Sequence, residues 1–166
     1  MTTRNRSEIL RAVKDDLEGL GLLGLIVIRD SIDHILETDS VPFAVVHMLS
    51  TEYEVRSAAV RFMRMTVGIT VFADLVEPEW TIVGDGGMSP GILEIQDQLS
   101  SRYTPSGVPF APATVTTFGG RVHTGKIVSH GAPVPVTIPI VQDRFNIRPG
   151  TLLRATSQLQ LDLYQS

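Results

Sequence analysis

Apolar and polar residues alternate along the chain with two periods, one typical of helices and one typical of strands. From Ser7 to Leu20 the apolar residues recur every three or four positions, which places them on one side of a helix. Ser7 is a suitable N-cap, and Gly19 or Gly21 suits the left-handed conformation that commonly ends a helix. The apolar face of this predicted helix consists of Ile9, Leu10, Val13, Leu17 and Leu20.

The middle of the chain predicts a second amphipathic helix. Ser89 gives an N-cap and Pro90 a proline at the first helical position, while Pro105 brings the helix to an end. The preceding stretches 77–80 and 84–87 have the composition of loops. The apolar face of this helix consists of Ile92, Ile95, Leu99 and Tyr103.

Three strands are predicted in the first half, at Leu25–Arg29, Ser40–Leu49 and Val60–Leu75. The third alternates regularly and is far longer than the usual strand of about 5–6 residues. We therefore expect it to bend at Gly68 or to project beyond the sheet, where it would meet other chains.

The segment from Thr104 to Gly150 is rich in proline and glycine and poor in charge. The Gly-Gly pair at 119–120 predicts a hairpin between 114–118 and 121–128. Further on, Val134, Val136, Ile138 and Ile140 alternate with residues that include Pro135 and Pro139. Prolines two or four apart remove N–H donors from the same edge, so this segment is predicted to be an edge strand or arm that pairs on one side.

The alternation returns from Thr151 to Tyr164 and predicts a closing strand with one complete apolar face. Together the elements predict a single α+β domain over residues 1–166. Its sheet is expected to be mixed and mostly antiparallel, flanked by two helices, with an additional β-hairpin or arm, a Pro/Gly-rich insertion at about 104–150.

Composition narrows the possible functions. An apolar fraction of 43% and a charged fraction of 19% suit a globular domain. The net charge of −4 and the scattered Lys and Arg argue against specific nucleic-acid recognition. Without cysteine there is no disulfide, thiolate metal site or Cys nucleophile. The charged N-terminus predicts no signal peptide, and no apolar run is long enough to span a membrane.

Catalytic and metal-binding motifs are not evident. The four histidines, His34, His47, His123 and His130, form no ligand pair with the spacing of a zinc site. The glycines at 84–87 lack the spacing of phosphate-binding loops, and no serine lies in a nucleophile elbow. We therefore expect no enzymatic activity, no cofactor and no bound metal.

The order of the N-terminal elements resembles a known family. The helix with Ile9-Leu10-Arg11-Ala12-Val13 leads to a short strand ending Ile28-Arg29-Asp30, then to Asp39-Ser40-Val41-Pro42-Phe43-Ala44-Val45-Val46 and the Glu-Tyr turn of Ser50-Thr51-Glu52-Tyr53-Glu54. This order is similar to that of the tail terminator, or tail completion, family of long-tailed bacteriophages, which includes the minor tail protein U of phage lambda. The resemblance covers about the first 80 residues and the last 15.

The resemblance implies a structural role in a virion. Members of the family form hexameric rings that cap the finished tail tube and present a surface to the head–tail connector or stopper protein. It thus implies a homo-oligomer that contacts the tail tube protein and the connector, located in the phage tail or neck and, during assembly, in the host cytoplasm. The block at 104–150 departs from the compact family pattern.

Two alternatives remain open from the sequence. One is another phage neck, connector, stopper or baseplate protein. The other is a small enzyme or ligand-binding domain with a site formed by Asp30, His47, Asp74 and Glu77. For the structural role, the residues that we predict to contact other subunits are Phe62, Arg64, Phe72, Phe118, Arg121, Val134, Val136, Ile138 and Ile140.

Overall fold

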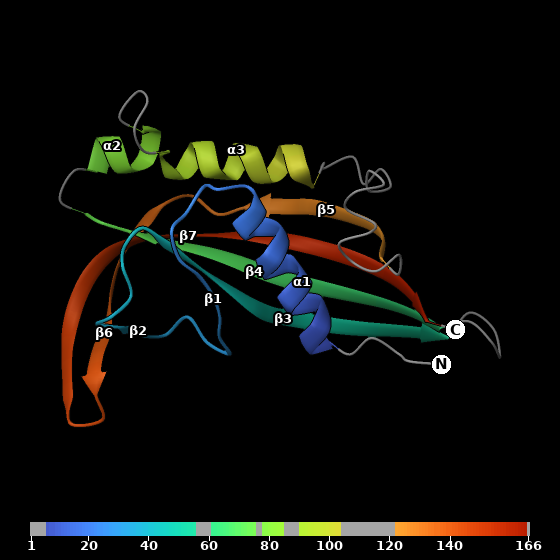
Figure 1. The fold of residues 1–166 in the computed structure, drawn as a ribbon, viewed down its shortest axis with the longest axis horizontal. Helices are drawn as coiled ribbons and strands as arrows, with labels where there is room; N and C mark the ends of the chain where they lie inside the picture. Colours follow the sequence, from blue (N-terminus) through green and yellow to red (C-terminus); the bar gives the residue numbers. More distant parts are fainter. Residues whose placement is uncertain (1–5, 56–60, 76–77, 85–89, 104–121, 166) are drawn as a thin grey trace.

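The structure, a computed structural model, describes residues 6–55, 61–75, 78–84, 90–103 and 122–165 (Figure 1). These residues form an α+β fold, as the sequence predicts. The helices are α1 (Arg6–Gly19), α2 (Pro78–Val83) and α3 (Ile92–Arg102). The strands are β1 (Ile26–Ile28), β2 (Ile35–Leu36), β3 (Phe43–Val55), β4 (Arg61–Ala73), β5 (Val122–His130), β6 (Val134–Asp143) and β7 (Asn146–Gln165).

The strands form one mixed sheet in the order β1-β3-β4-β7-β6-β2, with β5 also paired to β7. The two short strands β1 and β2 run parallel to their neighbours, and all other pairs are antiparallel. β7 has 20 residues and organises the sheet. Its first part pairs with β6 and its second part with β5, and the strand curls strongly between them (Figure 1).

The two faces of the sheet bury two separate apolar clusters. On one face, the apolar sides of α1 and α3 pack against alternate residues of β4 and β7, and this is the larger cluster. On the other face, the curl of β6 and β7 brings Ile138, Ile140 and Leu152 over Phe43 and Phe72. The curled hairpin of β6 and β7 thus covers part of the second face of the sheet.

Polar contacts join the two long helices to each other and to the sheet. Asp16 of α1 is buried and accepts hydrogen bonds from the Arg102 guanidinium and the Tyr103 hydroxyl at the end of α3. Burial and the neighbouring Asp16 carboxylate raise the pKa of Tyr103 well above its ordinary value of 10.0. Further along α3, the Gln96 amide donates to the carbonyl of Gly131, 2.8 Å away. The helix layer is therefore fixed to the sheet at several points.

Three boundaries differ from the sequence prediction. β3 continues through 50–55, the stretch assigned to a Glu-Tyr turn, because a bulge between Met48 and Ser50 interrupts the alternation without ending the strand. Residues 78–83 form the short helix α2 rather than a loop. The helix α3 begins at Ile92 after Gly91, so the predicted cap at Ser89-Pro90 is wrong by two residues.

β4 was predicted either to bend at Gly68 or to project beyond the sheet, and the second alternative is wrong. The strand lies between β3 and β7, and it pairs with β7 from Arg61 to Ala73 and with β3 from Arg61 to Phe72. The predicted hairpin between 114 and 128 lies outside the described residues except for its second strand, which is β5.

Candidate interaction surfaces

The turn between β6 and β7 is built around Asp143. Its carboxylate accepts hydrogen bonds from the backbone N–H of Phe145 at 2.8 Å and of Asn146 at 3.0 Å, and from the Asn146 amide at 2.8 Å. The bonds from Asn146 and then Phe145 lower the pKa of Asp143 below its ordinary value of 3.8. A short loop with this many internal bonds is rigid, since its own side chains satisfy its backbone.

This rigid turn presents an aromatic side chain to solvent. Phe145 is 80% exposed, and the Arg144 guanidinium lies over its ring, 4.7 Å from the centre. Ile147, just beyond, is 58% exposed. Phe145 and Ile147 thus expose two large apolar side chains close together on one ordered hairpin, and an exposed apolar surface of this kind is a candidate contact with another chain. We name Arg144–Phe145 the hairpin tip.

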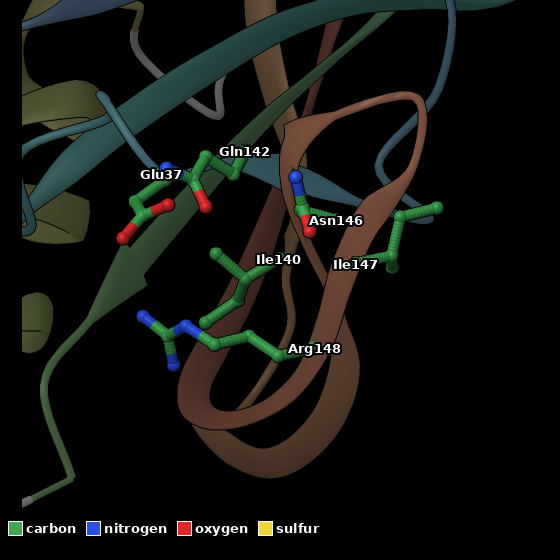
Figure 2. Close-up of a pocket in the computed structure, with 6 residues that line it drawn as sticks. All are labelled: Glu37, Ile140, Gln142, Asn146, Ile147 and Arg148. Carbon is green, nitrogen blue, oxygen red and sulfur yellow. The ribbon is translucent and has the colours of Figure 1, made fainter.

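A cavity of about 220 Å³ lies beside the tip (Figure 2). Ile140, which is 9% exposed, is its most buried apolar residue. The backbone N–H of Glu37 donates to the carbonyl of Val141 at 2.9 Å, which fixes the end of β2 against the hairpin. The cavity is therefore preformed. It is lined by Glu37, Ile140, Gln142, Asn146, Ile147 and Arg148, and we name it the hairpin pocket.

The prolines of β6 face the edge away from β7, as the sequence predicts. The carbonyl of Val141 points to β2, so the backbone groups of Pro139 and Pro135, two and six residues earlier, point to the same side. β2 pairs only with Ile140 and Val141, beyond the last proline of the strand. The prediction that β6 pairs on one edge alone is thus correct up to Pro139 and wrong after it.

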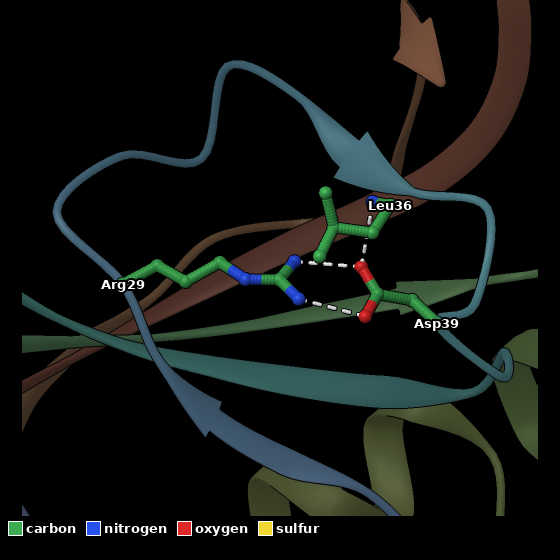
Figure 3. A network of polar contacts seen from close by, with 3 residues as sticks. All are labelled: Arg29, Leu36 and Asp39. Atoms are coloured by element: carbon green, nitrogen blue, oxygen red, sulfur yellow. Dashed lines mark hydrogen bonds and ion pairs between the residues drawn. The ribbon is translucent and has the colours of Figure 1, made fainter. Parts of the chain in front are cut away.

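An ion pair holds the segment that leads from β1 to β2 in place (Figure 3). Arg29 donates to both carboxylate oxygens of Asp39, at 2.6 and 2.7 Å, and the Leu36 N–H donates to the same carboxylate at 2.8 Å. Burial alone would raise the pKa of Asp39, but the hydrogen bonds from Arg29 and Leu36 and the charge of Arg29 outweigh it and lower the pKa. This link positions β2 and with it one wall of the hairpin pocket.

The outer edge of β3 is the second candidate surface. β1 covers this edge only as far as Val46, and no strand of the described residues covers it further. The exposed side chains Leu49, 43%, and Tyr53, 64%, lie along the uncovered part. An uncovered strand edge presents free N–H and C=O groups to which another chain can pair.

The bulge at Leu49 determines which backbone groups face this free edge. Before it, the N–H of Ala44 bonds outward to the carbonyl of Leu25, so even-numbered residues face outward. The bulge shifts the pairing by one residue, so Thr51 and Tyr53 face outward after it. The N–H of Tyr53 is therefore a donor at the free edge.

The second face of the sheet is polar where the curled hairpin does not cover it. Glu52, Arg64 and Asp162 are opposite one another on β3, β4 and β7. Arg64 donates to Asp162 at 2.9 and 3.3 Å, and this bond together with the nearby carboxylates raises the pKa of Arg64. Cross-strand charge pairs of this kind suit a solvated face.

Several residues predicted to contact other subunits are core residues instead. Phe72 is fully buried and stacks on Phe43 with ring centres 5.3 Å apart, and Phe62 is 7% exposed beneath Arg64. Ile138 and Ile140 are buried in the second cluster. For Phe72, Ile138 and Ile140 the prediction failed because the curl of β6 and β7 covers a face that alternation alone marks as free.

The other predicted contact residues have different outcomes. Arg64 and Val136 are partly exposed, and Val134 is 46% exposed on β6. Phe118 and Arg121 lie outside the described residues. Phe145 was not among the predicted contact residues. The sequence nevertheless indicates its exposure, because Phe145 stands between Asp143-Arg144 and Asn146, which are polar residues typical of a turn.

The residues of the alternative enzymatic site do not come together. His47 is buried, and its Nε2 lies 2.9 Å from the hydroxyl of Thr70, which in turn lies 2.8 Å from that of Thr156. Asp74 lies beyond the end of β4, about 20 Å along the strand from the residue that pairs with His47. Glu77 lies outside the described residues, and Asp30 is exposed.

The described residues contain no group of three or more His, Asp or Glu side chains that could hold a metal ion. None of the helices in the same residues has the length and apolar character needed to cross a membrane. No protein family model matches the chain, and none of the curated proteins matches its sequence.

Proposed function

We propose that the protein is a structural subunit that assembles into a ring at the head-proximal end of the tail of a long-tailed phage. In this role it ends growth of the tail tube and joins the tail to the head–neck connector. The partners are then further copies of the chain, the tail tube protein and the connector or stopper protein. The function arises from shape and from subunit contacts rather than from chemistry.

The free edge of β3 is the observation that carries the proposal. Edge strands are usually short, bent or protected, since an exposed edge promotes uncontrolled pairing. Here the proline-bearing strand β6 is protected in this way, whereas no strand of the described part of the chain pairs with the outer edge of β3 beyond Val46, beside Leu49 and Tyr53. A subunit that adds its strand to a neighbour's sheet needs one open edge of this kind. A ring closes when the open edge meets a different surface of the next copy.

The order of the elements supports the phage assignment. The resemblance to tail terminators implies a small mixed sheet flanked by helices, and a mixed sheet with its long helices α1 and α3 against one face agrees with it. The curled arm belongs to the block at 104–150 that departs from the family pattern. Other neck, connector or baseplate proteins can assemble through an open strand edge in the same way, but they bind a different partner. Binding to isolated tail tubes distinguishes the tail terminator from these alternatives.

Replacement of Tyr53 by proline tests the proposed contact. Because the N–H of Tyr53 faces the free edge, Tyr53→Pro removes one edge donor and leaves the ladder with β4 intact. We expect the variant to remain folded and to lose the ring, the oligomer larger than a dimer, as measured by native mass spectrometry and by electron microscopy of tail tubes with added protein. Tyr53→Ala is the matched control, since it removes the same side chain and keeps the donor.

A further inference from the structure

We propose that the hairpin tip of one copy binds in the hairpin pocket of a second copy, and that the second copy returns the same contact. Phe145 enters the pocket over Ile140, and Arg144 reaches Glu37 on the pocket wall. This is a two-fold contact between two chains. It is separate from the edge of β3, and it does not depend on the proposed function.

The size and lining of the pocket suit a phenyl ring. A protein cavity of about 150 Å³ admits benzene, so the hairpin pocket with about 220 Å³ has room for the side chain of phenylalanine. Ile140 provides the apolar contact, whereas the side chain of Ile147 points away from Ile140 and Arg148 (Figure 2). The aliphatic stem and guanidinium of Arg148 lie on another wall, where a cation can face an aromatic ring. Arg144 already packs against Phe145 in this way within one chain.

Charge complementarity identifies the occupant as a second copy of this chain. The tip carries the positive charge of Arg144 next to its aromatic ring. The pocket carries Glu37 as well as Arg148, so Glu37 offers an acidic partner to Arg144 and Arg148 offers a cation to the ring of Phe145. The side chains of Arg144 and Glu37 are both exposed, and among the described residues neither forms an ion pair. A tip that inserts Phe145 therefore brings Arg144 toward an acidic group without breaking an ion pair among the described residues.

Both halves of the contact are rigid before binding. Asp143 fixes the turn that carries the tip, and the bond from Glu37 to Val141 fixes the pocket wall. Preformed partners lose little conformational entropy on association, so a small contact of this kind can still be specific. Because tip and pocket lie on the same hairpin, two copies related by a two-fold axis satisfy both contacts at once.

Sedimentation velocity of the full chain tests this contact. The Tyr53→Pro background is used so that association through the β3 edge does not contribute. We expect a concentration-dependent dimer that Phe145→Ser weakens at least tenfold. Val134→Ser, a change at an exposed apolar residue of the same hairpin outside the pocket, is expected to leave the dimer unchanged. Thermal melts monitored by circular dichroism check that each variant is folded.

A charge exchange makes the test specific for two copies of this chain. Arg144→Glu alone and Glu37→Arg alone each place like charges together and are expected to abolish the dimer. An equimolar mixture of the two variants pairs Glu with Arg at both contacts, so we expect the dimer to return. Three results would each overturn the proposal. They are a Tyr53→Pro protein that stays monomeric at every concentration, a dimer that is insensitive to Phe145→Ser, and a mixture of the two charge variants that stays monomeric.

Discussion

Two aromatic residues, Phe72 and Phe145, differ sharply in their burial. Phe72 lies within β4 and is fully buried, whereas Phe145 lies on the turn between β6 and β7 and is 80% exposed. Burial determines the energetic role of each. Phe72 contributes to folding, and Phe145 is available for binding.

Truncation of these two residues should have opposite consequences. Phe72→Ala removes a stacked ring from the second cluster and is expected to lower the free energy of unfolding by about 3–5 kcal/mol. Phe145→Ala is expected to change it by less than about 0.5 kcal/mol. Urea unfolding in the same buffer measures both. Equal effects of the two changes would contradict the burial described for them.

Two histidines make stability depend on pH. Burial lowers the pKa of His47 below its ordinary value of 6.5, and burial also lowers the pKa of His130, against the opposing charge of Asp97. The rings of both accept or donate hydrogen bonds, His47 with Thr70 and His130 with Ser100 and Ser157. The neutral form of each ring is thus favoured in the folded chain.

The lowered pKa values of His47 and His130 make the folded chain less stable in acid. Below pH 6.5 the unfolded chain takes up protons that the folded chain does not, so stability is full above pH 6.5 and falls as the pH is lowered through this range. The slope is at most about 1.4 kcal/mol per pH unit for each histidine. In the variant with both His47→Gln and His130→Gln, urea unfolding between pH 7 and 5 should show a flatter dependence. An unchanged slope would show that other groups cause it.

At the scale of elements, the alternation of residues predicted most of the strands but not their relation to one another. The strands β4 and β7 and the helix α1 follow from periodicity because each has a continuous apolar face. The second half of β3 could not be found in this way, since the bulge at Leu49 reverses the pattern. The curl of β7 has no local signal, because it results from pairing with β6 and β4 at different parts of the strand.

Because alternation does not reveal how the strands pack on one another, it also could not show which candidate contact residues are buried. Alternation placed Phe72 on the exposed face of the long strand and Ile138 and Ile140 on an edge strand or arm, yet it could not reveal that the curl buries them against each other. The proline pattern of β6 was informative because it acts through the backbone, independently of what covers the side chains.

The segment between β1 and β3 depends on one ion pair. Arg29→Gln leaves the Asp39 carboxylate, whose side chain is 4% exposed, without its cation. We expect a loss of about 3 kcal/mol in the free energy of unfolding. Lys14→Ala, which breaks an exposed pair with Glu18 on α1, should cost less than about 0.5 kcal/mol. If both substitutions have the same small effect in urea unfolding, Asp39 does not anchor this segment.

At the scale of the whole molecule, helices cover one face of the sheet and a curled hairpin covers part of the other, while one strand edge stays open in the described residues. This arrangement separates folding from assembly. The buried clusters stabilise the subunit, and the surfaces proposed for contact, the β3 edge and the hairpin tip, contribute little to that stability. Variants at these surfaces should therefore change assembly with little effect on folding.

Native mass spectrometry of the unmodified chain, compared with Tyr53→Pro and Tyr53→Ala, tests the central claim most directly. The proposal predicts a single closed oligomer larger than a dimer for the unmodified chain and for Tyr53→Ala, and no such oligomer for Tyr53→Pro. An unmodified chain that forms nothing larger than a dimer, even with tail tubes present, would contradict it. So would a Tyr53→Pro variant that assembles as the unmodified chain does.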